Sequence, residues 1–188
     1  IGTIAKAYIQ PTKVAEYQLG ELPTILDMYV LSYNSQKHLR TASQTLKQNL
    51  KTYLSEYRMI NDSIKIKDAY IINIICNFDI IVLPNFNNNT VILNCINELT
   101  NYFNIDNFNI NQPILLKSLT ILLDKVEGVQ TVINVEIKNI SGASKGYSDY
   151  SYDINAATNN RVIYPSVDPM VFELKYPGVD ITGRVVPL

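Results

Sequence analysis

The longest apolar run of the chain, Ala69–Leu83 (AYIINIICNFDIIVL), constrains the fold more than any other segment. Asn73, Asn77 and Asp79 interrupt it, and it is shorter than the ~20 residues that a membrane-spanning helix needs. Its many isoleucines and its aromatic residues are typical of a strand. We therefore expect one long, largely buried strand, which ends where Pro84 and a cluster of asparagines follow.

Two helical patterns and one alternating pattern come next. Apolar residues recur at three- and four-residue steps over residues 89–103 and again from about Gln112, where Pro113 suits a first helical position. Gly128 stands where a helix would end in a left-handed residue. Residues 129–140 alternate, which indicates a strand with one wet side. Its expected apolar face consists of Val129, Thr131, Ile133, Val135 and Ile137.

Before the long strand, the sequence predicts a smaller set of elements. Residues 1–24 show no sustained period and indicate an extended connecting segment with at most one short strand. Ile25–Tyr33 is typical of a strand, and the alternation of Ile64–Lys67 of another. Between them, residues 35–57 predict a long amphipathic helix with Ser35 as its N-cap.

These elements define the predicted fold class as α+β. The order strand, helix, helix, strand folds most simply as a small mixed or antiparallel sheet covered by two antiparallel helices. An N-terminal strand and long helix precede this core, and an irregular C-terminal docking segment follows it. We divide the chain into an N-terminal part (1–62), an α+β core (63–140) and an exposed loop with the docking segment (141–188).

Charge and glycine content argue against several classes of function. The chain has 16 basic and 17 acidic residues, a net charge of −1, and no basic run that would follow a phosphate backbone. Its seven glycines are scattered and do not form a phosphate-binding loop. We expect no nucleic acid, membrane, cofactor or small-molecule substrate as a partner.

Isolated reactive side chains do not indicate catalysis. His38 is the single histidine, no local motif supplies it with a serine or cysteine partner, and we expect it on a solvated helix face. Cys76 and Cys95 lie in apolar segments, so we expect buried free thiols.

The carboxylates offer equally weak candidates. Asp149 and Asp153 lack the alternating oxygen ligands of a calcium loop, so we predict no metal site there. A glycoside hydrolase pair could be sought among Asp168, Glu173 and Asp180, but we expect Glu173 to face water or a lysine. The sequence therefore predicts a protein that is not an enzyme.

The C-terminal stretch YPSVDPMVFELKYPGVDITGR is the best candidate for a partner surface. Its prolines favour an extended course, Asp168 and Asp180 can cap turns or pair with Arg161 or Arg184, and the apolar residues between them can contact a partner. Tyrosine is common in specific interfaces, although several tyrosines in or beside this part of the chain could instead cover the sheet edge of their own domain. They are Tyr147, Tyr150, Tyr152, Tyr164 and Tyr176. The candidate interface residues are Tyr164, Pro165, Asp168, Met170, Phe172, Tyr176, Pro177 and Arg184.

Three stretches carry a resemblance to a known family: NLKTYLSEYRMINDSIKIKDAYIINI, NYFNIDNFNINQPILLKSLTILLDKVEGVQTV and YPSVDPMVFELKYPGVDITGRVV. Over residues 22–188 the chain resembles the C-terminal region of the baseplate wedge protein of T4-type contractile-tailed bacteriophages, the baseplate J-like family. The most specific pieces are residues 50–62, Asn111–Pro113 with Gly128–Val129, and Pro165–Arg184.

The resemblance implies a structural virion protein without catalytic residues. Copies would associate with each other and with other wedge proteins to close a ring around the hub, in the tail baseplate of a virion made in the bacterial cytoplasm. An N-terminal part beyond this chain would bind the other wedge proteins. Two alternatives stay open: a receptor- or carbohydrate-binding tail component with a tyrosine pocket near Asp149 and Asp153, and an oligomeric adaptor outside phage tails.

Overall fold

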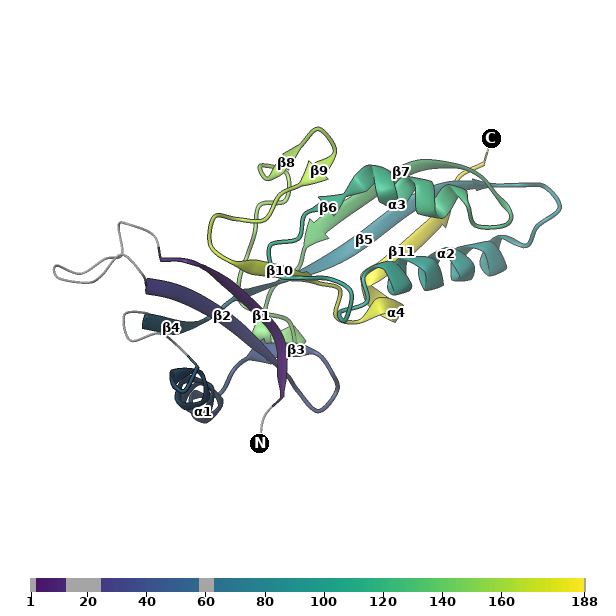
Figure 1. The fold of residues 1–188 in the computed structure, drawn as a ribbon. Coiled ribbons are helices and arrows are strands. Elements are labelled where there is room, and N and C mark those ends of the chain that lie inside the picture. The colour runs from purple at the N-terminus through teal and green to yellow at the C-terminus, as the bar shows by residue number, and fades with distance from the viewer. Residues whose placement is uncertain (1–2, 13–24, 58–62, 188) are drawn as a thin grey trace. The chain divides into compact units, whose positions relative to one another are not determined.

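A computed structural model describes residues 3–12, 25–57 and 63–187 of the chain (Figure 1). The chain divides after Tyr70 into two units, Ile1–Tyr70 and Ile71–Leu188. The predicted boundaries after residues 62 and 140 differ from this division. β4 (Ser63–Asp68) belongs to the sheet of the first unit, and the strands of the C-terminal segment belong to the sheets of the second unit. The predicted α+β class is confirmed, since both units combine strands with helices.

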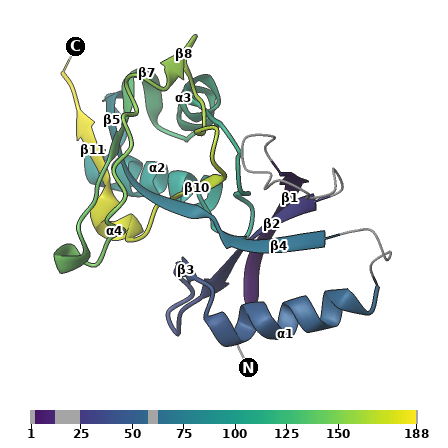
Figure 2. The same cartoon turned by 90° about the vertical axis from the view of Figure 1, so that its left-hand side faces the viewer.

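The first unit is built around β2 (Ile25–Tyr33), the strand predicted there. β1 (Ile4–Pro11) pairs antiparallel with one edge of β2. β3 (Leu39–Thr41) pairs antiparallel with its C-terminal part, and β4 pairs parallel with its N-terminal part. The sequence between β3 and β4 forms α1 (Gln44–Ser55), which packs on one face of this sheet (Figure 2).

The helix predicted to begin at Ser35 begins at Gln44 instead, with Ser43 as its N-cap. The reason is a turn: the side-chain oxygen of Asn34 accepts hydrogen bonds from the backbone N–H of Gln36 (2.8 Å) and of His38 (2.9 Å). The φ angle of Lys37 is +61°, which is incompatible with a right-handed helix. The prediction of a helical His38 is therefore wrong, since His38 precedes strand β3.

The core of the first unit lies between its sheet and α1. Met28, Val30 and Ala42 are buried at its centre. The partly buried residues that surround them are Leu46, Leu50, Leu54, Ile64 and Ile66. Asp68 ties the start of the helix to β4, because its carboxylate accepts hydrogen bonds from Ala42 N and from Lys47 Nζ.

The second unit is built around β5 (Tyr70–Val82), the predicted long strand. β7 (Val129–Asn139) pairs antiparallel with β5, β11 (Ile181–Val185) pairs parallel with it, and β10 (Met170–Glu173) pairs with it as well. Helices α2 (Asn88–Tyr102) and α3 (Leu116–Asp124) lie over β11 and β7 (Figure 1). The residues buried between sheet and helices include Ile74, Phe78, Ile80, Leu99, Leu119 and Leu123.

A second, smaller sheet interrupts the predicted succession of two helices. Residues expected to start a helix near Gln112 form β6 (Ile114–Leu115), which pairs with β9 (Val162–Ile163), and β9 pairs with β8 (Thr158–Asn159). Helix α3 therefore starts only at Leu116. The predicted order strand, helix, helix, strand is an incomplete description, because β6 stands between the helices and residues 141–188 supply four further strands, two of them in this smaller sheet.

The predicted apolar face of β7 is wrong at two positions. Val135 and Ile137 are buried as expected, whereas Thr131 is exposed and Ile133 is 55% exposed. The register against β5 shifts between Asp79 and Ile80 and again after Ile81. Because each shift by one residue turns the side chains to the opposite face, the alternation in sequence does not persist as one face in space.

The C-terminal segment was predicted to be irregular apart from one short strand over Met170–Tyr176, and β10 confirms that strand. The segment also supplies β11, a further strand of the sheet built around β5, and the short helix α4 (Pro177–Asp180). Its pairing partner β5 lies about a hundred residues earlier in the chain. Gly183 is required by this pairing, because an added Cβ would lie 2.3 Å from Cζ of Phe78. The segment is therefore part of the core rather than an appendage.

Candidate interaction site

The structure separates the eight predicted interface residues into buried and exposed groups. Met170 and Phe172 are 1% and 2% exposed, so the prediction that they contact a partner is wrong. Their strand β10 is held inside the unit: Met170 N donates to Asn111 Oδ1 (3.1 Å), and Asn111 N donates to the Met170 carbonyl (2.8 Å). The ring of Phe172 packs edge-on against Tyr152.

Three further predicted residues have contacts within the chain. Tyr176 packs edge-on against the ring of Tyr147, and Pro177 occupies the first turn of α4. Arg184 pairs with Asp79 through two hydrogen bonds of 2.9 and 3.0 Å, rather than with a carboxylate of its own segment. These residues therefore have structural partners, and the alternative that some tyrosines cover their own sheet holds for Tyr147 and Tyr152.

The remaining predicted residues lie together in an exposed loop, residues 164–168. Tyr164 is 50% exposed, Pro165 is half-buried and Asp168 is exposed. Val167, which the sequence analysis did not single out, is 81% exposed in the middle of this loop. Because nothing in the sequence marks an exposed valine, only the structure reveals it.

Hydrogen bonds hold this exposed loop in position. The Tyr152 hydroxyl donates to the carbonyl of Tyr164 (2.8 Å). The hydroxyl of Ser166 donates to the Asp168 carbonyl (2.6 Å), and its backbone N–H lies 3.1 Å from the sulfur of Met170. The exposed side chains of Tyr164 and Val167 therefore extend from a backbone that hydrogen bonds hold in place.

A buried polar cluster anchors the loop after β7 to the sheet. Asn73, 1% exposed, donates from Nδ2 to Glu173 Oε2 (2.8 Å) and accepts at Oδ1 from Ser148 N (2.7 Å). Its carbonyl accepts hydrogen bonds from Asn139 Nδ2 and Ile140 N. Glu173 is only 3% exposed, so it does not face water.

The second buried carboxylate of this unit, Asp180, is 1% exposed. It accepts hydrogen bonds from the Tyr147 hydroxyl (2.6 Å) and from Tyr176 N (2.7 Å), and thereby caps a turn as predicted. Burial, followed by the hydrogen bond to Asp180 and its charge, raises the pKa of Tyr147 to about 12. Donors from the chain itself thus account for the burial of both carboxylates.

The two carboxylates considered for metal binding, Asp149 and Asp153, accept hydrogen bonds from their own loop. Asp149 Oδ1 accepts from Ala143 N (2.8 Å), and Asp153 Oδ1 accepts from Ala156 N (3.0 Å). Within residues 3–12, 25–57 and 63–187, no group of three or more His, Cys, Asp or Glu side chains could hold a metal ion.

The two cysteines are buried free thiols, as predicted. Burial raises the pKa of Cys76 to about 12. Burial, with a smaller contribution from the charge of Glu98, raises the pKa of Cys95 to about 11. Both thiols are therefore protonated and unreactive in the folded unit at neutral pH.

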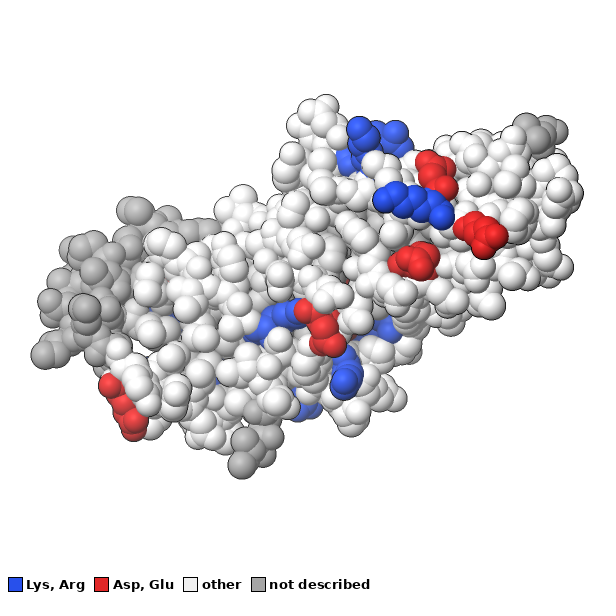
Figure 3. Space-filling view, turned by 45° about the vertical axis from the view of Figure 1, so that its right-hand side comes forward, with Lys and Arg blue, Asp and Glu red and all other residues white. Residues whose placement is uncertain are grey.

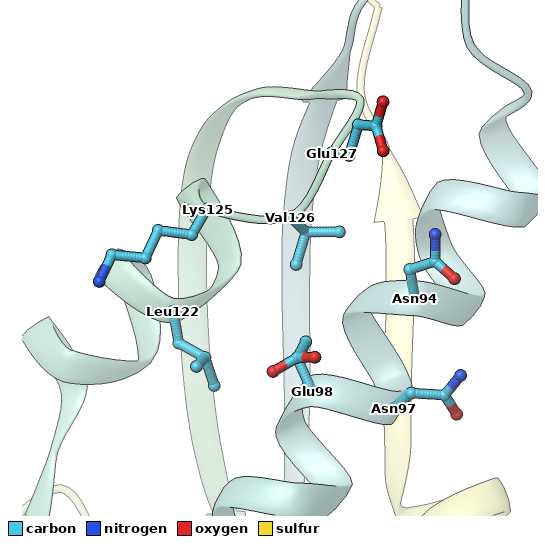
Figure 4. Close-up of a pocket in the computed structure, with 7 residues that line it drawn as sticks. All are labelled: Asn94, Asn97, Glu98, Leu122, Lys125, Val126 and Glu127. Carbon is cyan, nitrogen blue, oxygen red and sulfur yellow. The ribbon is translucent and has the colours of Figure 1, made fainter.

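An open cleft of about 380 Å³ lies between the two helices of the second unit (Figure 4). Asn94, Asn97 and Glu98 line it from α2, and Leu122 from α3. The chain that follows α3 also lines the cleft, and the side chain of Lys125 extends away from α2 (Figure 4). None of the residues that line this cleft belongs to a predicted site, because its mixed polar and charged lining forms no motif in the sequence.

The surface shown in Figure 3 carries few charged side chains, and basic and acidic groups are mixed on it. It therefore offers no large patch of one sign to a highly charged partner. None of the helices in the described part of the chain is long and apolar enough to cross a membrane.

No model of a known protein family matches the sequence, and no curated protein matches it.

Proposed function

We propose that this chain is a structural component of a contractile phage tail, a baseplate wedge protein whose copies associate to link wedges into a ring. The observation that carries the proposal is the contact between two stretches of the resemblance that are distant in sequence. Asn111 and Met170 exchange backbone and side-chain hydrogen bonds, so the stretches around Asn111–Pro113 and Pro165–Arg184 meet in one core.

Other residues of the resemblance have equally structural tasks. Gly128 has a φ of +93° and packs so closely that an added Cβ would lie 2.7 Å from Val91 Cγ2. Gly183 lies against the ring of Phe78, and Asp180 caps the turn that precedes β11. Motifs that maintain a fold, rather than a reaction centre, are consistent with a scaffold protein of the J-like family and its strand–helix–helix–strand core.

Self-association is proposed to use the exposed loop 164–168. Tyr164 and Val167 present aromatic and apolar surface on a backbone that hydrogen bonds already fix, so little conformational entropy is lost on binding. In the assembled baseplate such a contact would persist while other contacts rearrange during sheath contraction. The proposed location is the virion tail baseplate, with assembly in the bacterial cytoplasm.

Light scattering over a concentration series tests this proposal. We expect dimers or larger assemblies of the chain, and a dissociation constant raised at least about tenfold by the double substitution Tyr164→Asp and Val167→Asp. Val179→Asp is the matched control, because Val179 is 75% exposed outside this loop. A monomer at every concentration, or an equal effect of the control, would contradict the proposed self-contact.

The alternative of a receptor- or carbohydrate-binding tail component depends on a tyrosine pocket near Asp149 and Asp153. Both carboxylates accept hydrogen bonds from backbone amides of their own loop, which gives them a structural task. We therefore prefer the scaffold proposal.

A further inference from the structure

The outer edge of β7 has backbone groups available for another strand. β7 pairs with β5 along its inner edge. Among the described residues, Val135 and Ile137 form no backbone hydrogen bond to any element on the other side of β7. An edge of this kind is a template for an additional strand.

The ladder between β5 and β7 defines which groups point outward. Ile140 N donates to the Asn73 carbonyl (3.0 Å), which makes these two residues a hydrogen-bonded pair. Because such pairs alternate along an antiparallel ladder, residues 134, 136 and 138 bond to β5. Val135 and Ile137 lie between them and direct their N–H and C=O groups away from β5.

A groove of about 380 Å³ follows this edge. Val135 and Ile137 line it from β7, and Ile154, Asn155 and Ile163 line it from the segment that leads to and forms β8 and β9. Val135, Ile137, Ile154 and Ile163 are each at most 6% exposed, so the apolar surface of the groove is formed by well-packed side chains.

Both ends of the free edge are occupied by the chain itself. At one end, Val132 N donates to Asp124 Oδ1 (3.0 Å). At the other end, Tyr152 N donates to Asn139 Oδ1 (3.0 Å). The free stretch between them suits an extended segment of about five residues, roughly 17 Å long.

The charges of the groove indicate an uncharged occupant. Its one lining carboxylate, Glu136, already pairs with Lys138 Nζ (2.8 Å). The other polar side chains of its lining are the amides of Asn134 and Asn155 and the hydroxyl of Thr158. A charged side chain entering the groove would lose hydration without meeting an unpaired opposite charge.

We propose that this groove binds one extended, uncharged segment of a partner protein, which adds a strand to the outer edge of β7. Backbone hydrogen bonds to Val135 and Ile137 supply the affinity. The inference does not require the proposed wedge function.

Nuclear magnetic resonance on the full chain tests the proposal with acetyl-Val-Thr-Val-Thr-Val-amide as the probe. In the free protein, we expect fast hydrogen exchange for the amides of Val135 and Ile137 and slow exchange for those of Asn134 and Glu136. Saturating peptide should slow the first pair selectively, because their N–H groups then donate to the added strand.

Two N-methylated peptides provide an internal control, because alternate amides of a strand face opposite edges. Methyl groups on the amides that face β7 should weaken binding about fivefold for each lost hydrogen bond, and methyl groups on the other set should have little effect. Equal binding of both peptides would overturn the proposal, as would absence of binding at about 1 mM peptide.

Substitutions at two exposed asparagines distinguish peptide binding in the groove from binding elsewhere on the surface. Asn155→Phe should fill the groove and reduce peptide affinity at least about tenfold, whereas Asn97→Phe on α2 should leave it unchanged. Slow exchange of Val135 and Ile137 that depends on protein concentration without peptide would identify a second copy as the occupant and overturn the inference.

Discussion

The two units of this protein bury carboxylates in different ways. In the first unit, Asp27 is fully buried on the central strand and pairs with Lys67 Nζ at 3.0 Å. Its second oxygen, Oδ1, has no hydrogen-bond partner among the described residues. Burial of this charge therefore depends on one lysine.

In the second unit, uncharged groups donate hydrogen bonds to the buried carboxylates. The amide of Asn73 donates to Glu173, and the hydroxyl of Tyr147 donates to Asp180. Each donor also connects a loop to the sheet, so loss of one contact affects segments far apart in sequence. An ion pair thus compensates one buried charge, whereas the hydrogen bonds of Asn73 and Tyr147 also tie the loop after β7 to β5 and α4.

The largest expected effect is the loss of the lysine. Lys67→Met should lower the free energy of unfolding of the first unit by about 3 kcal/mol, because it leaves the Asp27 charge buried and unpaired. Hydrogen exchange over β2 measures the change. Lys138→Met is the matched control: its partner Glu136 is exposed, so the loss should stay below about 1 kcal/mol. Equal losses in the two variants would mean that Asp27 does not require a charged partner.

Asn73→Ala tests the cluster in the second unit. It removes the donor to Glu173 and the acceptor of Ser148 N, and should cost about 2 kcal/mol. Cys76 and Cys95 report the effect, because their thiols are buried only while this unit is folded.

We expect faster alkylation of both thiols in this variant, while exchange in β2 of the first unit is unchanged. Asn77→Ala, a substitution of a half-buried asparagine on the same strand, controls for loss of an amide. An unaltered alkylation rate in Asn73→Ala would show that the cluster contributes little to stability.

The sequence predicted the elements that carry their own periodicity. The runs that became β2, β5, α2 and β7 were assigned correctly, because their apolar patterns satisfy local geometry and burial together. The helix predicted from Ser35 is too long at its start, because its apolar pattern includes Leu39, which is buried in strand β3. A turn held by the side chain of Asn34 comes before β3, and the apolar pattern contains no sign of that turn.

Of the C-terminal strands, β10 has a local signal in the sequence, the short alternation over Met170–Tyr176, whereas β11 has none. β11 has five residues and includes a glycine. It is stabilised by pairing with β5, which lies about a hundred residues earlier in the chain. Such non-local pairing leaves no period in a short segment. For the same reason the sequence could not distinguish Met170 and Phe172, which are buried, from Tyr164, which is exposed.

The smallest expected effect concerns the hydroxyl that Tyr147 contributes to the cluster. Tyr147→Phe leaves the ring contact with Tyr176 but removes one donor to Asp180, and should cost about 1.5 kcal/mol at neutral pH. An unfolded tyrosine has a pKa of about 10, and the folded environment raises the pKa of Tyr147 to about 12. The contribution of its protonated form is therefore complete below pH 10 and is lost as the pH rises through 12.

The difference in unfolding free energy between the natural chain and Tyr147→Phe should accordingly shrink between pH 10 and 12. Chemical denaturation at a series of pH values measures this difference. Tyr164→Phe is the control, because it removes a hydroxyl from a residue that is 50% exposed, and its difference should be small over the same range. A difference for Tyr147→Phe that grows with pH would mean that the phenolate is stabilised in the folded unit, contrary to a hydrogen bond donated to a buried carboxylate.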